Sequence, residues 1–240
     1  MRFASVVLVS VFVGSLWLAS CAGSGSKSPG KPAEPVDPQV ELAAARTAVA
    51  ADSTDAAAWF RLGVAWQTLG GVGSADSARI AYKAVLDLEP DNVEAVVHYG
   101  LTLEDLNKPA EALEQYQKAT ELAPDDPLPY INMGSLLYFQ YKRTYEAKSA
   151  LSRAVELDPN NADARFNLGV LFADAHLYRE AQLEWQTVLE LEPGGSAANL
   201  AQANLEKIQP FLEAQSAAAD SASAAADSSA AGTGSNGSAR

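Results

Sequence analysis

Few of the 240 residues in this chain have the type and spacing that a catalytic or metal-binding site requires. The two histidines, His98 and His176, lie far apart in the sequence and have no companion thiol. This arrangement is typical of neither a metal site nor a nucleophilic centre. The run Gly70-Gly71-Val72-Gly73 lacks the preceding strand of a dinucleotide-binding fingerprint, so it is typical of a turn. The sequence therefore predicts a protein that is not an enzyme, with no catalytic residues, no metal and no cofactor.

The single cysteine, Cys21, is the exception, because its position suggests a covalent modification. A mostly apolar run from Phe3 to Leu18 precedes it, short for a bilayer span of about 20 residues and typical of an export signal. The residues Leu18-Ala19-Ser20-Cys21 resemble the lipobox of bacterial lipoproteins. This resemblance implies that residues 1–20 are a signal peptide and that the Cys21 thiol receives a diacylglycerol. The alternative is an ordinary cleaved signal or an uncleaved anchor, with Cys21 unmodified.

The segments at the two ends of the chain differ in composition from its middle. Residues 21–37, rich in Pro, Gly and Ser, are expected to form a flexible tether after the lipidated cysteine. The residue after the cysteine is Ala22 and not the aspartate that retains some lipoproteins in the inner membrane, so we expect anchoring at the periplasmic face of the outer membrane. Residues 214–240 are mostly Ala, Ser, Gly and Asp without a large apolar side chain, which predicts a disordered tail.

The charge of the chain excludes one class of partner. It has 17 basic against 30 acidic side chains, a formal net charge of -13. Phosphate binding depends on clustered Lys and Arg, so we expect no nucleic acid partner.

A glycine and a proline recur with a fixed period through the middle of the chain. The glycines are Gly63, Gly100, Gly134 and Gly169, and the prolines are Pro90, Pro124, Pro159 and Pro193. Successive prolines are 34, 35 and 34 residues apart. Such a period indicates a stack of helix-turn-helix units, each completed by its neighbours.

These units resemble the tetratricopeptide repeat family, which implies an all-α fold: an α-solenoid of about four helix-turn-helix units. An N-terminal half-repeat helix is expected over Pro38–Ala51, and a C-terminal capping helix over residues 196–213. The solenoid then spans residues 38–213, with unit 1 at 56–92, unit 2 at 93–126, unit 3 at 127–161 and unit 4 at 162–195.

The resemblance also implies where a partner binds, in a concave groove lined by the first helix of every unit. By position, the groove residues are Phe60, Val64 and Gln67 in unit 1; Glu94, Val97, Leu101, Glu104 and Asp105 in unit 2; Ile131, Ser135, Tyr138 and Phe139 in unit 3; and Phe166, Val170 and Asp174 in unit 4. In one subclass of the family, Lys and Asn at such positions clamp a C-terminal carboxylate. Here Phe60, Val97, Ile131 and Phe166 stand in place of Lys, so no carboxylate clamp is expected.

The groove predicts a protein or peptide partner with apolar segments and basic side chains to pair with its acidic residues. The alternative for any one apolar position is that it packs against a facing helix. The favoured function is a membrane-anchored adaptor lipoprotein in the assembly or maintenance of a cell-envelope complex. The alternatives are a cell-wall polysaccharide binder, stacking sugars on Trp66, Tyr138, Phe139 and Tyr141, and a hydrolase.

Overall fold

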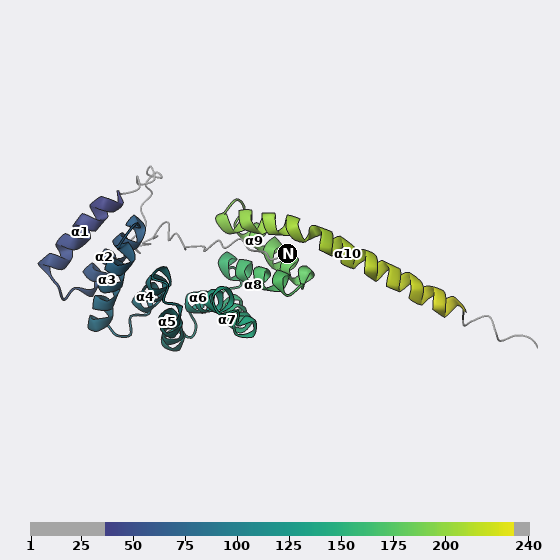
Figure 1. Cartoon of the computed structure of the whole chain (residues 1–240), viewed down its shortest axis with the longest axis horizontal. Coiled ribbons are helices and arrows are strands. Elements are labelled where there is room, and N and C mark those ends of the chain that lie inside the picture. Colours follow the sequence, from purple (N-terminus) through teal and green to yellow (C-terminus); the bar gives the residue numbers. More distant parts are fainter. Residues whose placement is uncertain (1–36, 233–240) are drawn as a thin grey trace, which may run out of the picture.

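The computed structural model describes residues 37–232, and within this range it contains ten helices and no strand (Figure 1). The predicted signal peptide, the lipidation site Cys21 and nearly all of the tether lie outside the described residues. The helices are α1 (Pro38–Ala51), α2 (Ala56–Leu69), α3 (Ser74–Leu88), α4 (Val93–Asp105), α5 (Pro109–Leu122), α6 (Pro127–Phe139), α7 (Thr144–Leu157), α8 (Ala162–Asp174), α9 (Tyr178–Leu191) and α10 (Ser196–Gly232).

Side-chain caps start the first helix of each unit. Asp55, Asn92, Asp126 and Asn161 each accept a hydrogen bond from a backbone N–H two or three residues later, at 2.9 to 3.1 Å. These bonds satisfy N–H groups that the helix itself leaves free. The capped helices are α2, α4, α6 and α8.

The repeated glycines let the two helices of each unit approach closely. A Cβ atom added to Gly63 or Gly100 would lie 2.6 Å from the ring of Tyr82 or Tyr116, respectively. The same contact is made by Leu151 over Gly134 and by Trp185 over Gly169. In each unit a large side chain of the second helix therefore packs directly against the backbone of the first helix at its glycine.

Successive helices pack side by side along the chain, from α1 to α9, as Figure 1 shows. Each second helix also packs against the first helix of the next unit, so buried clusters run along the stack and do not form one centre. The prediction of an all-α solenoid is confirmed.

Helix α10 caps the stack but does not end where the sequence suggested. Ala198, Ala201 and Ile208 are buried in a cluster with Trp185 of α9. The helix then continues to Gly232 and projects from the stack (Figure 1). The segment from Ala214 to Gly232, for which the sequence predicts disorder, is helical in this structure, and residues 233–240 of the predicted tail lie outside the described residues.

The reason for the longer helix is local. Between Ala214 and Gly232 the chain has no proline or further glycine, and alanine has the highest helix propensity of all residues. The packed part of α10 supplies the costly nucleus, so the extension needs only propagation. Despite its length, neither α10 nor any other helix in residues 37–232 is apolar enough to cross a membrane.

Candidate functional site

The predicted groove residues fall into three classes of exposure. The exposed ones are Glu94, Asp105, Phe139 and Asp174; the half-buried ones are Phe60, Val64, Gln67, Leu101, Glu104, Ser135 and Val170; the buried ones are Val97, Ile131, Tyr138 and Phe166. The first two classes provide the candidate surface, called the inner groove from here on. It combines apolar side chains on α2, α4, α6 and α8 with acidic side chains on α4 and α8.

The four buried residues do not offer a surface, and the prediction that they line the groove is wrong in that respect. Ile131 packs in a cluster with Ala154 and Ala164, and Phe166 lies against Trp185 with ring centroids 6.4 Å apart. Alanine on the neighbouring helices allows an approach close enough to cover these side chains. They support the walls of the inner groove from behind.

A polar network joins units 1 and 2 at the inner groove. The Tyr82 hydroxyl donates to Gln67 Oε1 at 2.5 Å, and Gln67 Nε2 donates to Thr102 Oγ1 at 3.1 Å. His98 Nδ1 lies 3.0 Å from the same Gln67 oxygen, and its ring stacks on Tyr82 with centroids 5.3 Å apart. Phe60 packs edge-on against both rings. Burial among these groups lowers the pKa of His98 to about 4, because the charged imidazolium loses its hydration.

The sequence did not reveal this network. The partners of His98, Gln67 and Tyr82, lie 31 and 16 residues away in the chain, so no spacing along the sequence pointed to them. The packing of α3 against both α2 and α4 brings the three side chains together. His176, by contrast, lies in the α8–α9 turn, with a positive φ of 61°.

Tyrosine hydroxyls also hold two acidic residues of the inner groove. Tyr116 donates to Glu104 Oε1 at 2.5 Å, and Tyr138 donates to Asp174 of the next unit. Burial raises the pKa of Glu104, although the bond from Tyr116 opposes that shift. Partial loss of hydration at its carboxyl also raises the pKa of Asp105, although the residue as a whole is exposed. A cationic side chain placed beside these carboxyls would favour their charged form, so the inner groove is suited to a basic partner.

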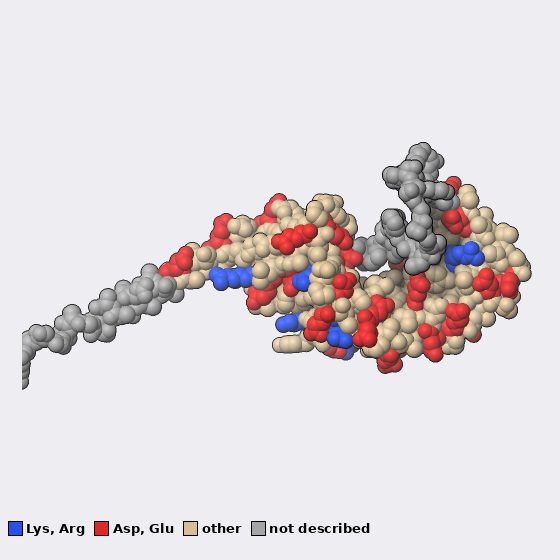
Figure 2. Space-filling view, turned by 180° about the vertical axis from the view of Figure 1, so that it is seen from behind, with Lys and Arg blue, Asp and Glu red and all other residues tan. Residues whose placement is uncertain are grey.

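A small hollow marks one end of the inner groove. It encloses about 240 Å³ and is lined by Ala56, Ala57, Phe60, Arg61, Glu89, Asn92 and Glu94. Phe60 and Glu94 are predicted groove residues, so an apolar ring and a carboxylate meet there. Figure 2 shows further Asp and Glu side chains spread over one face of the solenoid, with few Lys or Arg among them.

The aromatic residues suggested as sugar platforms have little free ring surface. The Arg46 guanidinium covers the Trp66 ring at 4.7 Å from its centroid, and Tyr138 is only 7% exposed. Tyr141 is half-buried, and Phe139 packs edge-on against Tyr138. Sugar stacking needs an open ring face, so the structure gives no observation that favours this alternative.

The described residues contain no cluster of three His, Cys, Asp or Glu side chains with the spacing of a metal site. What the inner groove can do chemically is bind: it combines apolar contacts, fixed tyrosine–carboxyl pairs and amide groups. Asn167 Nδ2, for example, donates to Ser135 Oγ across two units at 3.1 Å.

Comparison with known proteins gives the same fold assignment. Family models described as tetratricopeptide repeat match residues 67–127, 129–161 and 150–183. Curated relatives include a UDP-N-acetylglucosamine–peptide N-acetylglucosaminyltransferase of Giardia intestinalis, 31% identical over 55% of this chain and 9% of its own length. The CTR9 homologue of Arabidopsis thaliana is 31% identical over 46% of this chain and 10% of its length. The chain thus spans about a tenth of these relatives.

Solved structures match over more of their length. YrrB, described as a tetratricopeptide repeat protein with an unusual peptide-binding site, is 25% identical, with a TM-score of 0.53 over 69% of this chain and 84% of YrrB. MamA from Desulfovibrio magneticus RS-1 has a TM-score of 0.56 at 23% identity, covering 66% of this chain and 88% of MamA. At that identity the likeness to MamA shows the fold alone.

Proposed function

Since this chain is a tetratricopeptide repeat protein, we propose that it is a non-catalytic adaptor lipoprotein of the cell envelope. In this proposal Cys21 carries a lipid anchor at the periplasmic face of the outer membrane. The inner groove binds a segment of a protein partner during assembly or maintenance of an envelope complex.

One observation carries the binding part of the proposal. The first helices carry half-buried apolar side chains such as Val64, Leu101 and Val170, and two of these helices, α4 and α8, also carry exposed acidic ones such as Glu94 and Asp174. An extended or helical segment with apolar anchors and basic side chains complements such a face. The peptide-binding site named in the description of YrrB supports the proposal by analogy.

The groove can be tested with side chains that the core does not need. Val64 and Phe139 belong to none of the buried clusters, so Val64→Ala with Phe139→Ala removes groove surface at little expected cost in stability. We expect this pair to reduce the partner proteins captured by crosslinking in living cells, measured by mass spectrometry. Tyr138 is unsuitable because its burial and its bond to Asp174 would confound the result.

The matched control is Ile80→Ala with Leu183→Ala. These side chains are 58% and 64% exposed on the second helices α3 and α9, outside the inner groove. The control should capture the same partners as the parent. Undiminished capture by Val64→Ala with Phe139→Ala, at an unchanged melting temperature, would remove the inner groove from the proposal.

A further inference from the structure

A second groove, the outer groove, lies between the second helices α5 and α7. It encloses about 740 Å³, and its lining residues are Gln117, Thr120, Glu121, Tyr130, Met133, Leu137, Glu146, Ser149, Ala150, Ser152, Arg153 and Glu156. Helix α6 forms its floor through Tyr130, Met133 and Leu137. These are not the α6 residues of the inner groove, so the two surfaces are separate.

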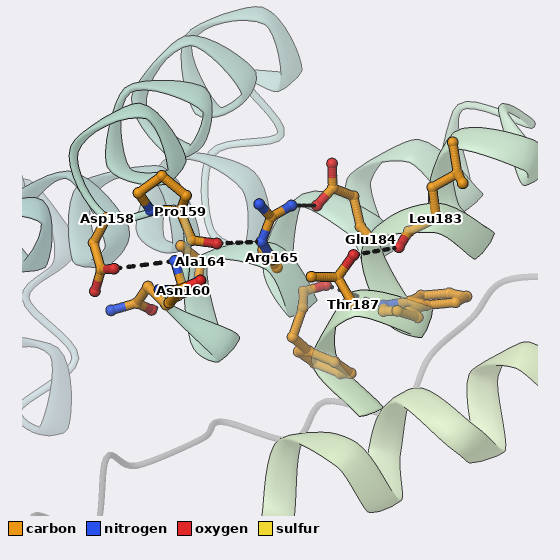
Figure 3. Close-up of polar contacts among 11 residues, drawn as sticks. Asp158, Pro159, Asn160, Ala164, Arg165, Leu183, Glu184 and Thr187 are labelled. Carbon is orange, nitrogen blue, oxygen red and sulfur yellow. Dashed lines mark hydrogen bonds and ion pairs between the residues drawn. The ribbon is translucent and has the colours of Figure 1, made fainter. Parts of the chain in front are cut away.

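The next unit shows what fills the equivalent space. Tyr130 and Arg165 each stand four residues before the repeated glycine, and Ala150 and Glu184 each precede the side chain that covers that glycine. In unit 4, Arg165 Nη1 lies 2.7 Å from Glu184 Oε2, and Arg165 Nε donates to the Pro159 carbonyl at 2.6 Å (Figure 3). Both charged side chains are less than one-fifth exposed. A guanidinium of the chain itself therefore occupies this position in unit 4.

Unit 3 has the corresponding helices, with Tyr130 at the position of Arg165, but lacks that ion pair. Ala150 replaces the glutamate, and it is flanked by Ser149 and Ser152 where unit 4 has Leu183 and Gln186. These small side chains on α7 leave the space between α5 and α7 open. The carbonyl equivalent to that of Pro159 is Pro124 O, whose contact with the Tyr130 hydroxyl is long, at 3.4 Å.

The charges at the outer groove favour a cationic occupant. Its lining includes Glu121, Glu146 and Glu156 against the single cation Arg153. Arg143 pairs with Glu146, and Arg153 lies 3.4 Å from Glu156, but within residues 37–232 no cation is in ion-pair distance of Glu121. An acidic second copy of this chain, with its net charge of -13, fits this lining poorly.

We propose that the outer groove binds an arginine side chain within a basic, partly apolar segment of a protein partner. The incoming guanidinium takes the place that Arg165 fills in unit 4, pairs with Glu121 and reaches the Pro124 carbonyl. Its methylene stem lies on Met133 and Leu137. The planar, forked donor set of arginine suits a carboxylate and a carbonyl together, which a lysine ammonium matches less well.

The test copies the filling of unit 4 into unit 3. Tyr130→Arg with Ala150→Glu should create an internal ion pair that closes the outer groove. The probe is an amidated peptide of alternating Ala, Leu and Arg that carries fluorescein and a benzophenone group. Fluorescence anisotropy with the purified full-length chain in detergent measures its affinity, and mass spectrometry locates its photocrosslinks.

We expect crosslinks on α5 and α7 and a loss of affinity of about tenfold or more in the closed variant. Glu121→Gln, an exposed and nearly isosteric change, should also weaken binding of the peptide. This second variant keeps the test valid if the closed variant does not fold. Ile80→Ala with Leu183→Ala, two exposed side chains that line neither groove, should leave this affinity unchanged, and the crosslink positions separate the outer groove from the inner one. Crosslinks confined to α4, α6 and α8, equal affinity of the Glu121→Gln variant and the parent, or no binding of the peptide would overturn the proposal.

Discussion

His98 illustrates how a single residue acquires its properties from the stack. Unfolded, its pKa is near 6.5, whereas burial against Tyr82 and Phe60 lowers the folded value to about 4. Between these values the unfolded chain binds the proton and the folded chain does not. Stability from this residue is therefore fully present above pH 6.5 and is lost as the pH falls toward 4.

This gives a prediction at the residue scale. His98→Asn introduces the side chain that units 3 and 4 carry at the same position, Asn132 and Asn167, and it does not titrate. The parent should lose on the order of 2 to 3 kcal/mol more than the variant between pH 6.5 and 4. Urea unfolding of both proteins across that pH range measures the difference between their free energies of unfolding. The titration of carboxyls such as Glu104 is common to both proteins and cancels in this difference. Parallel pH profiles would contradict the half-buried, neutral state of His98.

At the scale of one element, α10 has two parts with different roles. Up to Leu212 it packs on the stack, with Ile208 fully buried, whereas every side chain from Glu213 to Ser221 is exposed. Helical structure beyond the packed part rests on alanine propensity alone, since no tertiary contact is needed to explain it.

Truncation after Glu213 tests this division. We expect a smaller helical signal in circular dichroism with no change in melting temperature, because the side chains from Ala214 to Ser221 are exposed and bury no core surface. The contrasting variant is Ile208→Ala, which should cost about 2 to 4 kcal/mol through the cavity that it leaves. A truncated protein that melts earlier than the parent would show that the extension stabilises the stack after all.

At the scale of the whole molecule, the proposed lipid anchor would place the solenoid at a membrane surface. Acyl chains contribute about 0.8 kcal/mol per buried methylene, so more than one chain makes anchoring stable. Cys21→Ser should therefore move the protein from the membrane pellet to the soluble fraction when cells are fractionated. Ser28→Ala, a change in the tether that keeps the cysteine, is the control. Retention of the Cys21→Ser protein in the pellet would exclude a thioether-linked anchor.

The repeat architecture was predictable because its signals are local and recur. Gly63, Gly100, Gly134 and Gly169 mark the close helix contacts, and capping residues such as Asp55 and Asn92 stand directly before the helices that they start. Positions within one helix follow from its period. The first helices of all four units therefore begin where the sequence placed them.

The burial of side chains between units could not be predicted from the position of each residue within its own unit. Val97 and Leu101 lie one turn apart on α4, yet Val97 is 2% exposed and Leu101 is half-buried, because burial depends on what the adjacent units place beside each residue. The same holds for the outer groove: Ala150 and Glu184 are equivalent in sequence, but only packing shows one leaving a space and the other closing it. By itself the sequence determined the period, the helices and the fold, which arise from contacts within a unit. The tertiary structure decided which surfaces remain open, since that depends on contacts between residues about 35 positions apart.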